Sequence, residues 1–224
     1  MTAQSANSSN NKLWVTTFPV GALQCNCSIV ADPVSKEAVV IDPGGDADAI
    51  VKLLDDNGLK AKYLLHTHAH FDHILGSAKV AEKTGAKICV HKGDEWLYTN
   101  LALQGEFIGW NLSAEKISPI DHFLEDEEEL QLGQVKAQVI HTPGHTPGST
   151  CFCVQEKDES LLFAGDTLFH NSIGRTDLWG GSFDDIVKSI RSKLFRLEES
   201  TQVIAGHGPD TTIWEEKRNN PFVG

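Results

Sequence analysis

Thr67-His68-Ala69-His70-Phe71-Asp72-His73 is the stretch around which this sequence of 224 residues is organised. It follows the apolar run Tyr63-Leu64-Leu65, which is typical of a buried strand. In an extended segment, His68 and His70 point to one face because successive side chains alternate. Asp72 and His73 fall where a helix is expected to begin, so they approach from another side. Imidazole and carboxylate groups suit zinc, iron or manganese, and two directions of approach predict two adjacent metal ions.

The alternative interpretation is a histidine-rich surface loop or a fortuitous metal-binding tract. Such a tract would sit at a polar terminus, whereas this cluster follows a strand with a buried character. The metal interpretation is therefore favoured.

Composition narrows the possible partners. The net charge of −12 argues against nucleic acid, because neutralising phosphates needs a basic surface. No apolar run approaches the roughly 20 residues that span a bilayer, and the Ser/Asn-rich start lacks the apolar core of a secretion signal. A cytoplasmic protein without a membrane partner is expected. The five cysteines lack C-x-x-C spacing and are expected to be buried, reduced thiols.

Hydrophobic patterning predicts strands in both halves of the chain. We expect them at 13–18, 25–31, 38–41, 62–65 and 88–90, and again at 135–140, 150–154, 160–164 and 203–205. Helices are expected from Asp46 to about Asp56, from Asp72 or His73 to just before Gly85, from Ser182 through Leu197, and as a closing turn over 212–218. The stretch 93–120 is ambiguous, and fits a helix followed by a loop that packs over a pocket.

The second half repeats the plan of the first, with strands followed by a helix. Two sheets that face one another, with helices outside, would bury both sets of strands. No Pro/Ser/Gly-rich linker divides the halves. The sequence therefore predicts a disordered terminus over residues 1–12 and a single α/β domain over 13–224.

Three further candidate ligands follow predicted strands and stand beside glycine: His145, Asp166 and His207. Glycine lets the backbone turn sharply and approach a bound ion. Taken singly, each is as well explained by a turn residue or a helix cap. Their shared position at strand ends, together with the first cluster, favours a common metal centre.

This set of residues resembles the motif of the metallo-β-lactamase superfamily, from about Leu13 to about Arg218. The resemblance implies a four-layer αβ/βα sandwich with the metals at the sheet edges. It also implies that His68, His70 and His145 hold one metal and that Asp72, His73 and His207 hold the second. Asp166 would bridge the two.

A closer resemblance is to the short bacterial form of the glyoxalase II group. It is carried by Asp42-Pro43-Gly44-Gly45, the run from Thr142 to Gly148, the run from Phe163 to Phe169, and Ser172-Ile173-Gly174-Arg175-Thr176-Asp177. The resemblance implies a hydroxyacylglutathione hydrolase that converts S-lactoylglutathione to D-lactate and glutathione. Longer members carry a helical C-terminal domain that contacts glutathione, and this sequence ends soon after His207, so its grip on the thiol carrier is expected to differ.

The chemistry expected of such a site needs no serine or cysteine nucleophile. Two divalent ions, with zinc favoured and iron or manganese also suited, lower the pKa of a shared water toward neutrality and supply the attacking hydroxide. Asp72 is a ligand in this scheme and can also orient that hydroxide. Asn171 and Arg175, in the loop after Asp166, are candidate substrate contacts; Arg175 fits either a substrate carboxylate or a structural ion pair with Asp177.

A second enzyme class stays open. The run from Gly174 to Asp177 also resembles iron-dependent dioxygenases that act on glutathione persulfide, in which His70, His145 and Asp166 would hold one iron. A non-catalytic metal-binding protein would be expected to have lost one or more of the seven ligands, and none is missing here. The oligomeric state is not encoded in any motif.

Overall fold

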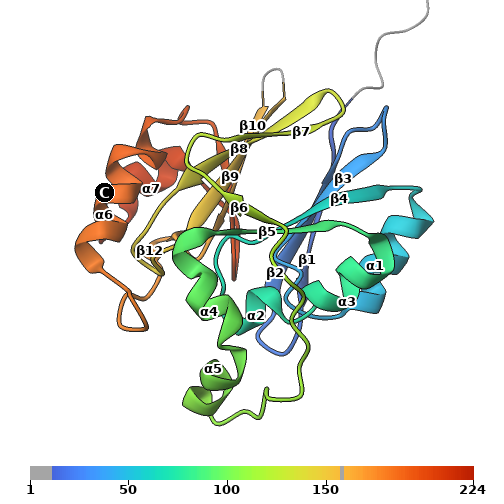
Figure 1. Cartoon of the computed structure of the whole chain (residues 1–224). Helices are drawn as coiled ribbons and strands as arrows, with labels where there is room; N and C mark the ends of the chain where they lie inside the picture. Colours follow the sequence, from blue (N-terminus) through green and yellow to red (C-terminus); the bar gives the residue numbers. More distant parts are fainter. Residues whose placement is uncertain (1–11, 157–158) are drawn as a thin grey trace, which may run out of the picture.

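In the computed structural model, residues 12–156 and 159–224 are described, and their strands form two six-stranded sheets and one short ribbon (Figure 1). The first sheet has the order β1 (Trp14–Val20), β2 (Cys25–Ala31), β3 (Glu37–Ile41), β4 (Lys60–Leu65), β5 (Lys87–His91) and β6 (His122–Leu124). The second has the order β14 (Thr211–Thr212), β13 (Gln202–Ala205), β10 (Glu159–Gly165), β9 (Thr150–Glu156), β8 (Val135–His141) and β7 (Glu129–Leu132). The ribbon pairs β11 (Leu168–Phe169) with β12 (Ser172–Ile173).

The two sheets face one another across a shared apolar core. Alternation along β3 sends Val39 and Ile41 into this core and Val40 to the opposite face. From the second sheet, Phe152 and Phe163 meet them, and both are almost fully buried. Because one packed cluster draws on strands from both halves, the expected face-to-face arrangement is confirmed.

Helices cover the outer face of each sheet. On the first sheet lie α1 (Ala47–Asp56) and α3 (Ser77–Thr84), whose Ile50, Leu54 and Val80 pack on the strands. On the second sheet lie α6 (Phe183–Ser192) and α7 (Ile213–Asn219), and Ile186 and Ile190 of α6 pack on its strands. The layers run helix, sheet, sheet, helix, so the predicted four-layer α/β sandwich is confirmed.

The helix expected after the histidine cluster is divided in two. α2 (Phe71–Ile74) ends at Leu75, and α3 starts after Gly76. The Gly76 N–H donates to the carbonyl of Pro43 at 2.8 Å. A Cβ at Gly76 would lie 2.5 Å from that carbonyl oxygen, so the close approach of the Asp42–Gly45 turn interrupts the helix.

Other boundaries also differ from the prediction. The sequence did not predict β6 and β7, which flank the acidic turn at residues 125–128, because both strands are short. The ambiguous stretch holds a 3-10 turn, η1 (Lys92–Asp94), followed by α4 (Glu95–Thr99) and α5 (Leu101–Ile108). α6 ends at Ser192, and Leu194 falls in a separate 3-10 turn, η2 (Leu194–Arg196).

Of the two predicted helix caps, one forms a cap hydrogen bond and the other does not. Ser182 caps α6 as predicted, because its hydroxyl accepts the Asp185 N–H. Asp46 stands at the N-cap of α1 but makes no cap hydrogen bond, since its carboxylate accepts the Gly21 N–H instead.

Disorder was predicted for residues 1–12. Of these, residues 1–11 lie outside the described part of the chain. All five cysteines are free and buried, as predicted. Among the described residues, no helix is long and apolar enough to cross a membrane.

Candidate metal centre

Seven predicted site residues meet where strands of the two sheets end. His68, His70, Asp72 and His73 follow β4, His145 lies in the β8–β9 loop, Asp166 follows β10, and His207 follows β13. The last two are brought together because β10 and β13 run parallel, with Gly165 paired to Ala205. The structure thus gathers all seven side chains, which lie far apart in the sequence, at one edge of the sandwich.

His68, His70 and His145 form the first group. The Nε2 atom of His145 lies 2.9 Å from Nδ1 of His70 and 3.3 Å from Nε2 of His68. His145 Nδ1 lies 2.8 Å from the carbonyl oxygen of Arg175, which can only accept, so Nδ1 carries the proton and Nε2 presents a lone pair. Three ring nitrogens therefore converge on one point, as ligands of a cation do.

Asp72, His73 and His207 form the second group. Oδ2 of Asp72 lies 3.1 Å from Nε2 of His207 and 3.7 Å from Nε2 of His73. His73 is fully buried, whereas 29% of the His207 side chain is exposed. This group thus opens toward solvent at His207.

Asp166 stands between the groups, with one carboxylate oxygen directed to each. Its Oδ2 lies 3.7 Å from Nε2 of His145, and its Oδ1 lies 3.5 Å from Nε2 of His73. This is the placement that a bridging carboxylate requires.

Unpaired buried atoms test whether metal ions fit here. His73 Nε2 and Asp166 Oδ1 are buried and have no hydrogen-bond partner, and the same holds for His70 Nε2. Leaving a buried polar atom unsatisfied costs about 1–3 kcal/mol, so such atoms need an explanation. A cation between His73 and Asp166 would satisfy both. The donor set, imidazoles and carboxylates, fits zinc, iron or manganese.

Electrostatics keep the first group ready to ligate. Burial first, and the neighbouring His145 second, lower the pKa of His70 to about 3. Burial and neighbouring imidazoles likewise hold the pKa of His68 well below its usual range. Both rings are therefore neutral at pH 7 and can offer lone pairs.

Burial alone would raise the pKa of Asp72, but His73 and His207 outweigh it and hold that pKa below its usual range. For His73, burial disfavours the imidazolium, yet the surrounding carboxylates of Asp42, Asp72 and Asp166 raise its pKa well above the usual value. The ionised carboxylates around His73 thus make the second group a favourable place for a positive charge.

Asp42 orients two of the ligand-bearing segments, a role that the sequence did not reveal. Its Oδ2 lies 3.0 Å from His73 Nδ1 and accepts the Thr67 hydroxyl, while its Oδ1 accepts the Thr67 N–H at 2.8 Å. A carboxylate on the far nitrogen of a metal-binding histidine fixes its tautomer and ring direction. The only sequence signal was the Asp-Pro-Gly-Gly turn.

Cys25 also approaches His73. Its Sγ is 3.4 Å from His73 Nδ1. Burial raises the pKa of Cys25 to about 11, so it is a neutral thiol at pH 7. Cys25 and Asp42 both contact Nδ1 of the ring, whereas Asp72 and Asp166 lie near Nε2.

Asp94, which is fully buried, joins the two ligand-bearing loops of the first group. Its carboxylate accepts hydrogen bonds from Ala69 N–H at 2.9 Å, from the Thr146 hydroxyl at 2.8 Å and from Gly148 N–H at 2.6 Å. Ala69 stands between two of the predicted ligands, and Thr146 follows the third. No sequence pattern marked this aspartate.

The other histidines near the motifs are not among the converging side chains. His66 is buried beneath the site, with Nδ1 3.0 Å from the Cys89 carbonyl and Nε2 2.6 Å from the Ser77 hydroxyl. His141 Nε2 lies 2.9 Å from the carbonyl of Pro147.

A cavity of about 350 Å³ opens over the centre. His70, Asp72, His145 and Asp166 form its polar side, and Arg175 lines it as well. Arg175 donates to Asp177 through Nε at 2.7 Å and Nη2 at 2.9 Å, so the ion pair considered from sequence is present. Asn171 does not line this cavity; its side chain lies 3.1 Å from His170 Nε2.

The four-layer sandwich and the histidine–aspartate cluster define a class of protein, the metal-dependent hydrolases of the αβ/βα fold. The sequence profile of the metallo-beta-lactamase superfamily matches residues 20–207. The chain belongs to this superfamily and is a metallo-hydrolase, and its family binds metal ions.

Within the superfamily, the chain is similar to a hydroxyacylglutathione hydrolase over nearly its whole length. The hydroxyacylglutathione hydrolase GloC of Haemophilus influenzae is 38% identical over 211 residues, covering 93% of this chain and 97% of the relative.

Three solved structures are similar over nearly the whole chain. A di-iron-bound form of TTHA1623 is 33% identical with a TM-score of 0.80, covering 92% of this chain and 99% of that one. The BLEG-1 B3 metallo-beta-lactamase is 36% identical with a TM-score of 0.79 and covers 94% and 99%. ETHE1 from Myxococcus xanthus is 26% identical with a TM-score of 0.76 and covers 94% and 84%.

Proposed function

We propose that this metallo-hydrolase cleaves thioesters of glutathione, with S-lactoylglutathione converted to D-lactate and glutathione. The observation that carries the proposal is the convergence of all seven predicted ligands into two groups joined by Asp166. The similarity to a hydroxyacylglutathione hydrolase over 93% of the chain supports the choice of substrate class.

We further propose that the site holds two divalent ions, with zinc favoured and iron or manganese also suited to the ligands. His68, His70 and His145 would hold one ion, Asp72, His73 and His207 the other, and Asp166 both. When bound, two such ions lower the pKa of a water toward neutrality and stabilise negative charge on a carbonyl oxygen. The di-iron-bound relative supports a pair of ions.

The protein groups define how the reaction proceeds around that pair. Asp72 stays ionised and faces the cavity, so it can accept a hydrogen bond from the attacking water and orient it. The water oxygen bonds to the acyl carbon, the carbon–sulfur bond breaks, and the products are a carboxylate, a thiol and one released proton. Arg175 lines the cavity with its side chain 58% exposed, so it can pair with a substrate carboxylate if it releases Asp177.

The direct test is thiol release from S-lactoylglutathione by purified, metal-loaded protein. His145→Gln should reduce kcat/KM by about 100-fold or more, because it removes a ligand of the first group. His122→Gln is the matched control, since His122 lies in β6 paired with Glu128, and should leave the rate unchanged. Absence of thiol release with two metal ions bound would reject the proposal. A chromogenic cephalosporin serves as a competing substrate class, given the similarity to BLEG-1.

A second candidate is oxidation of glutathione persulfide at one iron held by His70, His145 and Asp166. These three lie together, with His145 Nε2 at 2.9 Å from His70 and 3.7 Å from Asp166. The unsatisfied His73 Nε2 in the second group favours the two-metal site instead. Oxygen uptake with the persulfide as substrate, in the absence of thioester cleavage, would establish this alternative.

A further inference from the structure

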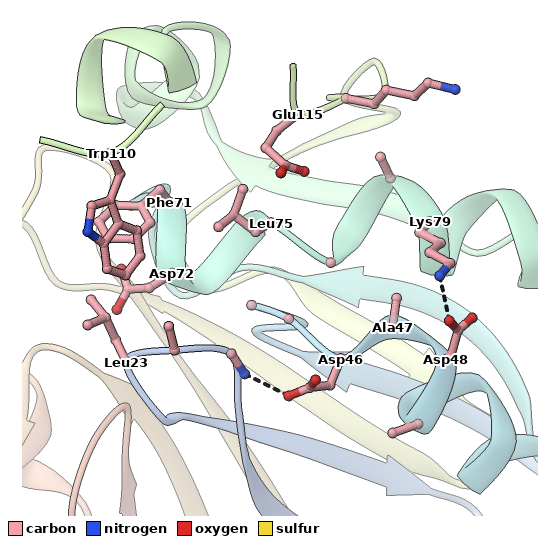
Figure 2. A pocket seen from close by; sticks show the side chains of 18 of the residues that line it. Leu23, Asp46, Ala47, Asp48, Phe71, Asp72, Leu75, Lys79, Trp110 and Glu115 are labelled. Atoms are coloured by element: carbon pink, nitrogen blue, oxygen red, sulfur yellow. Dashed lines mark hydrogen bonds and ion pairs between the residues drawn. The ribbon is translucent and has the colours of Figure 1, made fainter. Parts of the chain in front are cut away.

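The wall of the cavity opposite the metal centre is apolar and comes from three separate segments. Leu23 is supplied by the β1–β2 turn, Phe107, Ile108 and Trp110 by α5 and the residues after it, and Leu178 and Trp179 by the loop after Arg175. Figure 2 shows Trp110 lying against Phe71, with Leu23 and Asp72 beside them. The chain thus places apolar side chains directly next to a predicted metal ligand.

Aromatic contacts extend this wall from α5 to the metal centre. The rings of Phe107 and Trp179 meet edge to face with centroids 4.9 Å apart, and Trp179 lies 6.5 Å from the ring of His70. Phe107 nevertheless remains 61% exposed, and Trp110 40%. Large apolar side chains left open around a concave site are typical of a surface that a ligand covers.

The buried amide beside this wall is already hydrogen-bonded. The Gln104 amide donates to the carbonyls of Ala69 and Leu97, at 2.9 and 2.8 Å, and its oxygen accepts the Phe71 N–H. Arg175 is paired with Asp177. A hydroxyl group pressed against the aliphatic side chains of Leu23, Ile108 and Leu178 would lose water without gaining a hydrogen bond, which is unfavourable.

A neighbouring groove of about 880 Å³ has a different character. It shares Leu23, Phe71, Asp72 and Trp110 with the cavity. Charged side chains of both signs line its remainder: Asp46, Asp48, Lys79, Glu82, Glu115 and Lys116. Figure 2 shows Asp46, Asp48, Lys79 and Glu115 around it. A charged thiol carrier therefore has polar surface beside the metal centre and need not enter the apolar cavity.

We infer that the apolar cavity receives the acyl part of the thioester, and that the enzyme prefers acyl groups larger and more apolar than lactoyl. This inference rests on the proposed thioester hydrolysis. A lactoyl group is small and carries a hydroxyl, so it would fill little of the 350 Å³ cavity and leave the rings of Phe107 and Trp179 uncovered. A medium-length alkyl or an arylalkyl group would cover those rings.

The test compares kcat/KM for glutathione thioesters that carry lactoyl, acetyl, butanoyl, hexanoyl or phenylacetyl groups. The hexanoyl and phenylacetyl thioesters should exceed the lactoyl thioester by about tenfold or more, the size of effect that apolar pockets achieve. Equal or falling values, with thiol still released, would overturn the inference and leave the proposed function standing. No release from any member of the series would reject both.

Variants then locate the preference. Phe107→Ala and Trp179→Ala should each lower the hexanoyl-to-lactoyl ratio of kcat/KM by about fivefold or more, because they remove the covering rings. Phe222→Ala is the matched control; Phe222 is 45% exposed and lines neither the cavity nor the groove, so its ratio should equal that of the unmodified protein. A ratio unchanged in both cavity variants would overturn the inference.

Repeating the acyl series on a small uncharged thiol separates the two halves of the substrate. The same rank order of acyl groups is expected, because the carrier does not occupy the apolar cavity. A rank order that vanishes when glutathione is replaced would instead place the carrier against Phe107 and Trp179, and would overturn the assignment.

Discussion

The imidazole of His73 lies between two carboxylates of different function, with Nδ1 3.0 Å from Asp42 Oδ2 and Nε2 3.5 Å from Asp166 Oδ1. Both side chains of the His73–Asp42 pair are buried, at 0% and 2% exposed. Asp42 thereby fixes the direction in which the ring presents Nε2 to the second ligand group. The same carboxylate holds Thr67, at the start of the histidine motif.

Replacing Asp42 tests this positioning role. Asp42→Asn keeps the size of the side chain but removes the negative charge at His73 Nδ1, so metal affinity or activity should fall by about 10–100-fold. Competition with a chelating dye measures the affinity. Asp56→Asn is the control, because Asp56 pairs only with Lys52 on the surface of α1. Unchanged affinity in Asp42→Asn would show that His73 needs no such partner.

Gly206 tests how closely the backbone must approach Asp166. A Cβ at this position would overlap Asp166 Oδ1 and lie 3.0 Å from His73 Cε1. Gly206→Ala should therefore displace the carboxylate and reduce kcat by about 100-fold or more, comparable to the loss of a ligand.

Gly208→Ala supplies the comparison for Gly206→Ala. Gly208 has φ +75° with open space around its Cβ, so the substitution strains only the backbone. It should cost about 1–2 kcal/mol of stability and leave metal content intact. Similar activity losses in the two variants would contradict the importance of the Gly206–Asp166 contact.

Asp94 provides a test of the coupling between the two ligand-bearing loops. Asp94→Asn places an amide donor where three protein donors already point, so it should destabilise the fold by about 1–3 kcal/mol. Metal bound by His68, His70 and His145 should be lost before metal in the second group. Cobalt substitution reports this through the change in the visible spectrum; equal loss from both groups would argue against a local effect.

The Arg175–Asp177 pair has a measurable pH signature. Its hydrogen bonds lower the pKa of Asp177 from the usual 3.8 to about 2. Because the folded-state pKa lies below the unfolded value, the pair's contribution to stability is present above about pH 3.8 and is lost as the pH falls through about 2. Carboxyl NMR should show this low midpoint, and Arg175→Gln should return it toward 3.8. An unshifted midpoint in the unmodified protein would show that Arg175 is free for substrate.

The strands that carry the ligands were predictable because their apolar patterns are local. Each of His145, Asp166 and His207 follows an apolar strand and stands by glycine. β10 and β13 pair in parallel, and β8 runs in the same direction because β9 is antiparallel to both β8 and β10, so the three strands end at the same edge. The position of Asp42 at His73 was not predictable. It depends on the parallel pairing of β3 with β4, which brings the end of one strand beside the start of the histidine motif.

Long-range contacts also account for the other surprises. Asp94 lies in the turn before α4 and reaches two loops at once, so no spacing in the sequence marks it. The break between α2 and α3 arises because Gly76 meets the Pro43 carbonyl, although the helical periodicity continues across it. Trp179 contacts Phe107, which comes from a distant part of the sequence, so the hydrophobic pattern cannot reveal this pairing.

Metal titration of stripped protein, with thiol release from S-lactoylglutathione followed in the same sample, tests the central claim most directly. The account predicts no release without metal, and a rate that reaches its maximum at about two ions per chain. Asp166→Asn should fail to reach that maximum at any metal concentration. Full activity without metal, or two bound ions with no thiol released, would contradict a thioester hydrolase built on these seven side chains.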